Sequence, residues 1–344
     1  MKKKLAAVVI FLIICVTFNS LANYCLIQPG LARTVYNDAK KGGYDVILVG
    51  ASHGSYGLDP EVIEQETGLK TMNMCMGGEF FIDSYYTLCY ALQYSSPKQV
   101  VLDIDYQYLI NRDKQSLLFN NEYNGFPDGL LKLRYLARRI LPEDFRGAFL
   151  PWTNYWQCYK YIPKTIEKKQ SDAYKNYEPS VVDMNPYDHY YGGGFVYRDS
   201  EYKKDTTPAI YWDESKVSSS ELYYIKKIVK LCKSQGINIV FTTITQDPDM
   251  ISDQLSRFAD ADTYISNLAN TLDVDYYNFN YLTQEKFARD ASNFYDREGH
   301  MYGETAERFS RIFGKVLYKA WQGEEAEDLK ADYFTSTYAE LYRK

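Results

Sequence analysis

Short apolar runs alternate with amphipathic segments along much of the chain. Five runs have the length and character of strands: residues 44–50 (YDVILVG), 70–74, 99–104, 237–244 and 274–279. Five segments space their apolar residues as helices do: residues 60–67, 81–95, 218–235, 253–272 and 303–321. Strands that alternate with helices predict a parallel sheet with both faces covered. We therefore expect an α/β protein with a three-layer α/β/α, flavodoxin-like fold around five parallel strands.

One long region interrupts this alternation. Residues 107–211 are rich in aromatic side chains, such as Trp152, Trp156 and Tyr190, and contain three consecutive glycines at 192–194. An insertion of about a hundred residues in a compact α/β domain is usually a lid or a substrate-binding region. A peripheral helical subdomain without a ligand role is the alternative. We expect one domain over residues 29–344, with residues 107–211 inserted into it as a lid or substrate region.

The first 28 residues predict a membrane anchor or a signal sequence. Lys2, Lys3 and Lys4 precede an apolar run that starts at Leu5, and apolar residues recur as far as Ile27. This pattern is typical of an export signal or of an uncleaved anchor whose lysines stay inside. The length of the stretch favours a single-pass anchor in the cell membrane. The alternative is a secreted protein cleaved near Ala22; both interpretations make the rest of the chain extracytoplasmic.

Composition narrows the choice of partners. The 344 residues include 39 basic and 45 acidic side chains, and the net charge of -6 argues against a nucleic-acid partner. The six cysteines form no CxxC pair, so a metal site has little support, and disulfides are possible but not required. The 35 tyrosines suit cores, interfaces and sugar stacking alike.

A serine between two glycines follows the first predicted strand, in the segment GASHG at 50–54. Ligands of open α/β sheets bind at the carboxyl ends of strands, so Ser52 is a candidate nucleophile. An ordinary turn serine is the alternative. The segment also fits G-x-S-x-G, the nucleophile elbow of α/β-hydrolases. That elbow usually follows several strands, whereas Ser52 follows the first.

A nucleophilic serine needs a base, and the chain has three histidines: His53, His189 and His300. His53 adjoins Ser52, so its side chain is expected to point away from the serine hydroxyl. His189 lies in the aromatic insertion, where a structural or substrate contact is expected. His300 precedes the last helix, and two nearby carboxylates, Asp296 and Glu298, could orient its imidazole. His300 is therefore the candidate base.

Four segments resemble the SGNH/GDSL hydrolases, and in particular their membrane-anchored, DltD-like branch. VILVGASHGSYGLDP resembles the first block of the family, and TMNMCMGGEF resembles the second. YYTLCYALQYSSPKQVVLDID resembles the helix and strand that follow, and HMYGETAERFS resembles the last block. The resemblance covers roughly residues 44–110 and 236–320 and leaves the insertion aside. It implies the nucleophile at Ser52, the base at His300 and an oxyanion-hole glycine at Gly78.

The chain also departs from the family pattern. The usual DxxH spacing is replaced by Asp296 with three residues before His300, so Asp296 is the expected acid and Glu298 the alternative. The block that often contains GxND is absent, and Gln107 stands near the position of its amide. Gln107 could donate to an oxyanion. In the last block, Tyr302 and Thr305 replace the usual Asn and Gly.

The resemblance implies a serine esterase or O-acyltransferase that forms an acyl-enzyme and needs no cofactor or metal. It also implies a cell-envelope polysaccharide or teichoic-acid-like polymer as substrate or acceptor, and a membrane-bound O-acyltransferase as a possible partner. The altered blocks favour a rival class, a non-catalytic glycan-binding or accessory protein of such a system. A third interpretation is an anchored scaffold for the acyltransferase complex.

Overall fold

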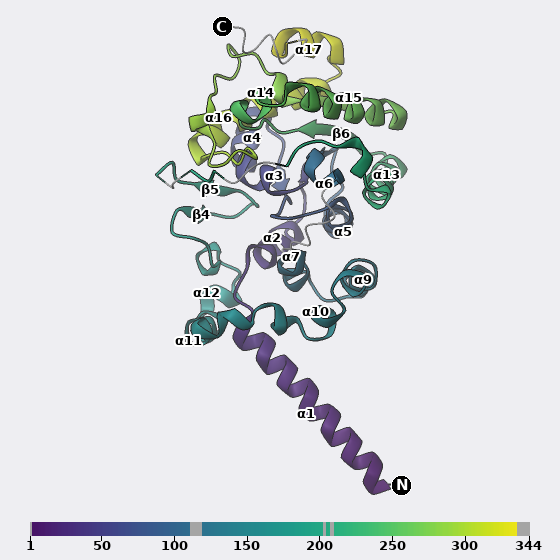
Figure 1. The fold of residues 1–344 in the computed structure, drawn as a ribbon, viewed down its shortest axis with the longest axis vertical. Helices are drawn as coiled ribbons and strands as arrows, with labels where there is room; N and C mark the ends of the chain where they lie inside the picture. Colours follow the sequence, from purple (N-terminus) through teal and green to yellow (C-terminus); the bar gives the residue numbers. More distant parts are fainter. Residues whose placement is uncertain (1, 111–118, 202–203, 207–209, 336–344) are drawn as a thin grey trace. The chain divides into compact units, whose positions relative to one another are not determined.

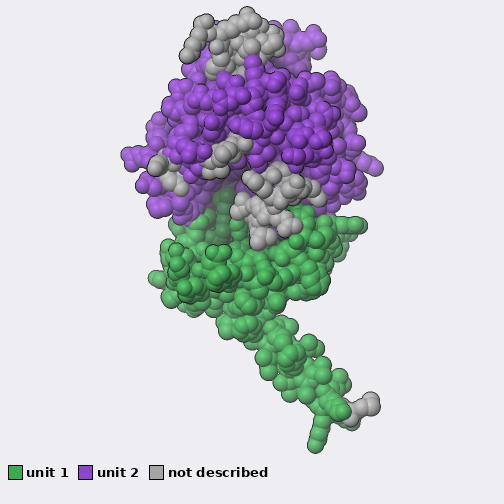
Figure 2. All heavy atoms as spheres, in the orientation of Figure 1, with its two compact units in different colours: residues 1–34, 120–183 green, residues 35–119, 184–344 purple. Residues whose placement is uncertain are grey.

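The computed structural model describes residues 2–110, 119–201, 204–206 and 210–335. The chain forms two compact units, which Figure 2 shows in green and purple. Unit 1 contains residues 1–34 and 120–183, and unit 2 contains residues 35–119 and 184–344. Within the predicted insertion at 107–211, residues 111–118, 202–203 and 207–209 lie outside the described residues.

Unit 2 is built on a five-stranded parallel sheet. Its strands are β1 (Val46–Val49), β2 (Thr71–Asn73), β3 (Gln99–Asp103), β6 (Asn238–Thr243) and β7 (Asp275–Asn278). Their order is β2-β1-β3-β6-β7, and every neighbouring pair is parallel. An order in which β1 lies between β2 and β3 is that of flavodoxin-like sheets. The predicted three-layer α/β/α fold is confirmed.

Helices cover both faces of this sheet. Those of the sheet domain are α3 (Ser52–Gly57), α4 (Pro60–Thr67), α5 (Phe81–Ala91), α6 (Tyr106–Ile110), α13 (Ser219–Ser234), α14 (Pro248–Ser252), α15 (Leu255–Leu272), α16 (Gly303–Trp321) and α17 (Ala326–Tyr333). Helices α4 and α16 pack together on one side of the sheet, and α5 and α13 pack together on the other (Figure 1). Short 3-10 turns occur at Glu214–Lys216, Phe279–Tyr281 and Ala291–Asn293.

The hydrophobic core explains why the sheet is buried on both faces. Val46 and Leu48 of β1 join the cluster that contains Phe309 and Phe313 of α16. Because side chains alternate along a strand, Ile47 faces the opposite layer, and it is fully buried there. A strand buried on both faces is mostly apolar, which is why the centres of these strands appear in the sequence as short apolar runs.

A small hairpin from the predicted insertion belongs to unit 2. Strands β4 (Asp188–Tyr190) and β5 (Val196–Arg198) pair antiparallel. The glycine turn between them lies against β2, because the Asn73 N–H donates to the Gly193 carbonyl over 3.2 Å. Gly194 has a φ of +88°, and a Cβ there would lie 1.8 Å from the Asn73 carbonyl oxygen. Only glycine allows this approach to the sheet.

Unit 1 is entirely helical among its described residues. It contains α1 (Lys2–Leu26), the first residues of α2 (Leu31–Lys40), and most of α7 (Phe119–Gly125). The remaining elements are α8 (Leu130–Tyr135), η1 (Leu136–Ile140), α9 (Leu141–Glu143), α10 (Phe145–Phe149), η2 (Pro151–Asn154), η3 (Trp156–Tyr161), α11 (Ile162–Gln170), α12 (Asp172–Lys175) and η4 (Pro179–Val181). Helix α1 is long and apolar enough to cross a membrane, by length and composition.

Candidate active site

Ser52 lies where β1 ends and α3 begins. Two glycines let the chain turn there. A Cβ on Gly50 would lie 2.7 Å from the Cβ of Asp103 on β3, and a Cβ on Gly54 would lie 2.3 Å from the Cys75 sulfur. The spacing G-x-S-x-G therefore reflects close packing of the β1 loop against β3 and the loop after β2. Ser52 stands at the switch point of the sheet, where strand order reverses and ligands of such folds bind.

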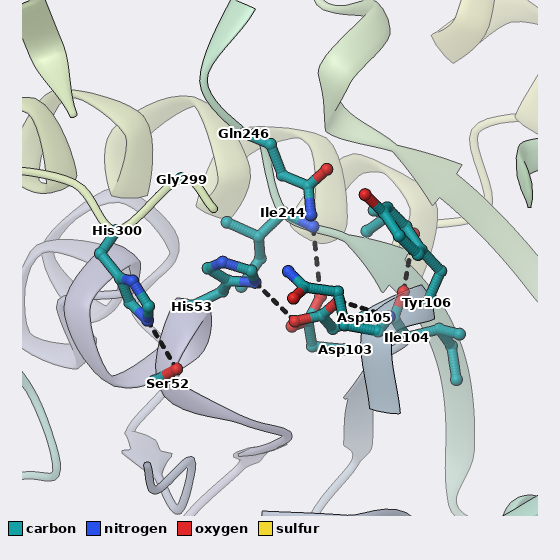
Figure 3. Close-up of polar contacts among 12 residues, drawn as sticks. Ser52, His53, Asp103, Ile104, Asp105, Tyr106, Ile244, Gln246, Gly299 and His300 are labelled. Atoms are coloured by element: carbon teal, nitrogen blue, oxygen red, sulfur yellow. Dashed lines mark hydrogen bonds and ion pairs between the residues drawn. The ribbon is translucent and has the colours of Figure 1, made fainter. Parts of the chain in front are cut away.

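Ser52, His300 and Asp296 form a continuous hydrogen-bonded chain. The Ser52 hydroxyl oxygen lies 2.6 Å from Nε2 of His300, and Nδ1 of His300 lies 2.5 Å from Oδ2 of Asp296. Figure 3 shows the contact between Ser52 and His300. An ionised carboxylate can only accept, so Nδ1 carries the proton that it donates to Asp296. Nε2 of the neutral ring is then free to accept the proton of Ser52.

Asp296 is held rigidly as an anion. Its Oδ1 accepts the backbone N–H groups of Gly299 over 2.9 Å and of His300 over 3.1 Å. Burial alone would raise the pKa of Asp296, but the charge and ring N–H of His300, with these two backbone groups, hold that pKa well below its usual range. The three residues between Asp296 and His300 form the tight loop that makes these bonds possible.

Glu298, the alternative acid, has a different environment. Its side chain is partly buried, and burial raises its pKa, although the nearby His300 and His53 oppose that change. The carboxylate hydrogen-bonded to the His300 ring is that of Asp296. The geometry thus favours Asp296 as the orienting acid.

Tyr108 is the residue of α6 that reaches the serine. Its side chain lies close enough to the Ser52 side chain and to the Gly78 backbone to interact with both, and burial raises its pKa above the usual value. Its ring packs edge-on against Phe80, with centroids 5.1 Å apart. Gly78 follows β2 in a turn and has a φ of +78°, a backbone conformation that favours glycine. Tyr108, which the sequence analysis missed, stands where Gln107 was expected.

Gln107 itself is buried in α6. Its backbone N–H donates to Oδ1 of Asp105 over 2.9 Å, which fixes the start of that helix. Adjacent residues of a helix point about 100° apart, so only one of the pair can face Ser52. The offset of one residue from the family position decides which side chain reaches the site.

A buried ion pair lies beside the catalytic chain. Nδ1 of His53 is 2.9 Å from Oδ2 of Asp105, and both side chains are 3% exposed (Figure 3). Burial lowers the pKa of His53, but the Asp105 carboxylate more than reverses this and raises it to about 9. Asp103, the last residue of β3, has its pKa raised to about 7 by burial and by Asp105. The His53 ring lies 4.8 Å from the His300 ring and turns away from Ser52 toward Asp105.

An aromatic and basic wall covers the other side of His300. The Tyr56 ring packs edge-on against His300 at 5.5 Å, and its hydroxyl donates to Asp188 of β4 over 3.0 Å. Arg198 of β5 pairs with the same Asp188 over 2.6 Å and stacks on Tyr56. The hairpin thus packs behind Tyr56, a residue of α3. His189, on the same hairpin, pairs with Asp199 over 2.8 Å and takes no part in the chain.

The arrangement can perform nucleophilic chemistry. A serine hydroxyl has a base within hydrogen-bond reach, the base has an orienting carboxylate, and N–H and O–H donors converge beside the hydroxyl. No group of three or more His, Cys, Asp or Glu side chains suited to a metal ion occurs among residues 2–110, 119–201, 204–206 and 210–335. Sequence signals existed for Ser52, His300 and Asp296. No local sequence pattern indicates the roles of Tyr108, of Tyr56 or of Asp105, the partner of His53. Each of these residues reaches the site through contacts between segments that are distant in the sequence.

Comparisons with known proteins add structural neighbours of low similarity. No family model matches the chain, and no curated protein matches it. The crystal structure of a candidate acylhydrolase from Bacteroides fragilis shares 10% identity with a TM-score of 0.40, over 85% of this chain and 97% of that chain. A GDSL-like lipase from Bacteroides thetaiotaomicron shares 10% identity with a TM-score of 0.33, over 89% of this chain and 96% of that chain. At this level of similarity, any functional assignment rests on the geometry of the site itself.

Proposed function

We propose that the protein is an extracytoplasmic serine esterase or O-acyltransferase with Ser52 as its nucleophile. One observation carries the proposal: the hydrogen-bonded chain from the Ser52 hydroxyl through His300 to Asp296. The hydrogen bond between Ser52 and His300 joins residues that are 248 positions apart in the sequence, and the bond between His300 and Asp296 joins residues that are 4 positions apart. A turn serine with no chemical role would not need a histidine beside its hydroxyl, nor a carboxylate that keeps Nε2 of that histidine unprotonated.

The reaction then has two balanced steps. His300 takes the Ser52 proton as the serine oxygen attacks an ester carbonyl, and it returns that proton to the departing alcohol. This leaves an acyl group on Ser52. Water or a sugar hydroxyl attacks the acyl-enzyme, again losing its proton to His300, and Ser52 is restored. Asp296 stabilises the imidazolium in both steps.

The negative charge on the carbonyl oxygen needs donors. The Ser52 N–H lies in the first turn of α3, where backbone donors have no partner within the helix. The Gly78 backbone and the Tyr108 hydroxyl both lie beside the Ser52 side chain, because Tyr108 interacts with each of them. We assign the oxyanion to these three donors, each worth about 2.7 to 4 kcal/mol in enzymes where one was removed.

The N-terminal helix supports a place at the membrane surface. With Lys2 to Lys4 inside, α1 is a single-pass anchor and the residues that follow it lie outside. The motif resemblance then suggests a cell-envelope glycopolymer, of polysaccharide or teichoic-acid type, as the bearer of the ester. It also suggests a membrane-bound O-acyltransferase that supplies acyl groups. The DltD-like branch is the part of the family that fits these features.

The test uses the full chain in detergent and in cells. We expect Ser52→Ala and His300→Ala to lower p-nitrophenyl acetate hydrolysis by at least a thousandfold in vitro. In cells, both variants change the acyl content of the envelope polymer. His189→Ala is the matched control, because the ion-pair partner of His189 is Asp199, which lies outside the chain from Ser52 to Asp296. Unchanged rates and unchanged acylation in both variants would rule out the enzyme.

One observation favours a non-catalytic alternative. The Tyr108 hydroxyl, beside the Ser52 side chain and the Gly78 backbone, occupies the region that a substrate oxygen would need. A glycan-binding or accessory protein could keep the fold with this position filled. It would bind envelope polymer with the same affinity in wild type and in Ser52→Ala, and neither protein would change the acyl content of the polymer.

A further inference from the structure

Unit 1 exposes large apolar side chains in one stretch of the chain. Phe145 is 70% exposed, Phe149 56% and Trp156 61%. The other members are Leu130, Leu133, Leu150, Tyr159 and Tyr161. A soluble surface rarely gathers so many large apolar residues within about thirty positions, and such patches mark a binding surface.

This stretch is fastened to the anchor helix. Asn19 of α1 donates to the Phe149 carbonyl over 3.1 Å, and Asn23 accepts the Trp152 N–H over 2.9 Å. The Phe18 ring packs edge-on against the Trp152 ring at 6.0 Å. Elements α10 and η2 therefore lie beside residues 18–23 of α1.

The length of α1 fixes the depth of that contact. A helix rises about 1.5 Å per residue, so Asn19 lies about 22 Å and Asn23 about 28 Å from Lys4 along the axis. The hydrocarbon core of a bilayer is about 30 Å thick, and tilting the helix brings both residues deeper. With Lys4 at the inner boundary, the level of Asn19 and Asn23 lies at or inside the outer boundary of the hydrocarbon.

The two asparagines fit that depth. Polar groups in hydrocarbon need partners within the protein, and one side-chain atom of each asparagine, Nδ2 of Asn19 and Oδ1 of Asn23, pairs with the backbone of residues 149–152. Without residues 149–152, these two atoms would interrupt an otherwise apolar span. Their place in the sequence, at the outer end of α1, is where a protein segment enters the lipid boundary beside the helix.

Charge and residue type complete the match to a lipid surface. Unit 1 has 14 basic and 8 acidic residues, while unit 2 has 25 basic and 37 acidic residues. Exposed cations flank the apolar stretch: Arg134, Arg138, Arg146, Lys160 and Lys164. Tryptophan and tyrosine prefer the membrane–water interface, and basic side chains pair with anionic headgroups.

We propose that residues 145–161 of unit 1 dock into the outer-leaflet interface of the bilayer, with Phe145, Phe149 and Trp156 below the headgroups. The partner is the lipid bilayer itself. The proposal rests on α1 as an uncleaved anchor, which is part of the proposed function. Residues 145–161 are thereby held at a fixed depth in the bilayer, and α1 does not act as a flexible linker to the rest of the protein.

The experiment measures tryptophan depth in the full chain, reconstituted in vesicles of phosphatidylcholine and phosphatidylglycerol with brominated acyl chains. The four tryptophans are Trp152, Trp156, Trp212 and Trp321. If the two of unit 1 lie in the interface, bromolipid quenches about half of the wild-type emission. The quenched fraction falls to about one third in Trp156→Phe and rises to about two thirds in Trp212→Phe. These single changes are mild, and Trp212→Phe is the matched control.

Two results would overturn the proposal. The first is a protein that floats with the vesicles while Trp156→Phe leaves the quenched fraction unchanged; the anchor then inserts but unit 1 stays in water. The second is a protein that does not float, in which case α1 is not an anchor. Esterase activity of the same samples reports separately on the Ser52 mechanism, so failure of either idea is recognised by itself.

Discussion

Replacing Asp296 by Asn tests which carboxylate orients His300. The variant keeps the shape of the side chain, and its remaining oxygen can still accept the N–H groups of Gly299 and His300. The amide nitrogen then faces Nδ1 of His300, 2.5 Å away in the wild type, and two donors cannot face each other. The imidazole must move its proton to Nε2, which can no longer accept from Ser52.

The expected loss follows from that tautomer. In serine proteases the equivalent change lowers kcat by about 10⁴, which corresponds to about 5.4 kcal/mol of transition-state stabilisation. We expect kcat/KM for p-nitrophenyl acetate to fall by 10³ to 10⁴ in Asp296→Asn, on the same scale. Glu298→Gln is the matched control, and its expected loss is less than about tenfold.

The thermal unfolding midpoints of both variants are compared with that of the wild type, so that a loss of activity caused by misfolding is recognised. The reasoning is refuted if Asp296→Asn stays within tenfold of wild type, and more sharply if Glu298→Gln causes the larger loss. The second result would show that the loop at 296–300 rearranges on substrate binding and that Glu298 is the acid.

Three further predictions concern the surroundings of Ser52. Tyr108→Phe removes one oxyanion donor and is expected to lower kcat by about 10²- to 10³-fold with little change in KM; an equal or faster rate would show that the hydroxyl only fills space. The folded-state pKa of Asp103 is about 7 and exceeds its unfolded value, so the folded wild type binds this proton more tightly than the unfolded chain does. The stability of the wild type therefore falls as the pH rises from about 4 to 7. Asp103→Asn has no such proton to lose, and its stability is expected to fall less over the same range. Urea unfolding at pH 5 and pH 8 measures it, and equal changes in both proteins would contradict it. Gly54→Ala places a Cβ 2.3 Å from the Cys75 sulfur and is expected to lower the unfolding free energy by about 1 to 3 kcal/mol; Gly77→Ala, whose Cβ would meet nothing within 4 Å, is the control.

The sheet could be predicted from the sequence because its strands are buried on both faces. Residues 46–49 and 239–241 are buried and apolar because they fill two layers, and that requirement is visible as local runs. Ser52 was found at the end of the first strand for a related reason, since a Gly-Ser-Gly turn breaks the apolar run abruptly. The helix cap at Asp59, which accepts the N–H groups of Glu61 and Val62, is also a local signal.

The side chains around Ser52 could not be predicted in the same way. Tyr108 comes from a five-residue helix whose rotation depends on the bond between Gln107 and Asp105. His53 is adjacent to Ser52, but its partner lies 52 positions later. The hairpin at 188–198 has strands of only three residues, which are too short to show a period.

Labelling of Ser52 tests the central claim most directly. The full chain is treated with a fluorophosphonate, which forms a covalent bond only with an activated serine, and the modified peptide is identified by mass spectrometry. The proposed mechanism predicts one adduct, on Ser52, that disappears in Ser52→Ala and falls at least a hundredfold in rate in His300→Ala. A protein that stays unlabelled, or that carries its adduct on another residue at the same rate in His300→Ala, would contradict Ser52 as the nucleophile.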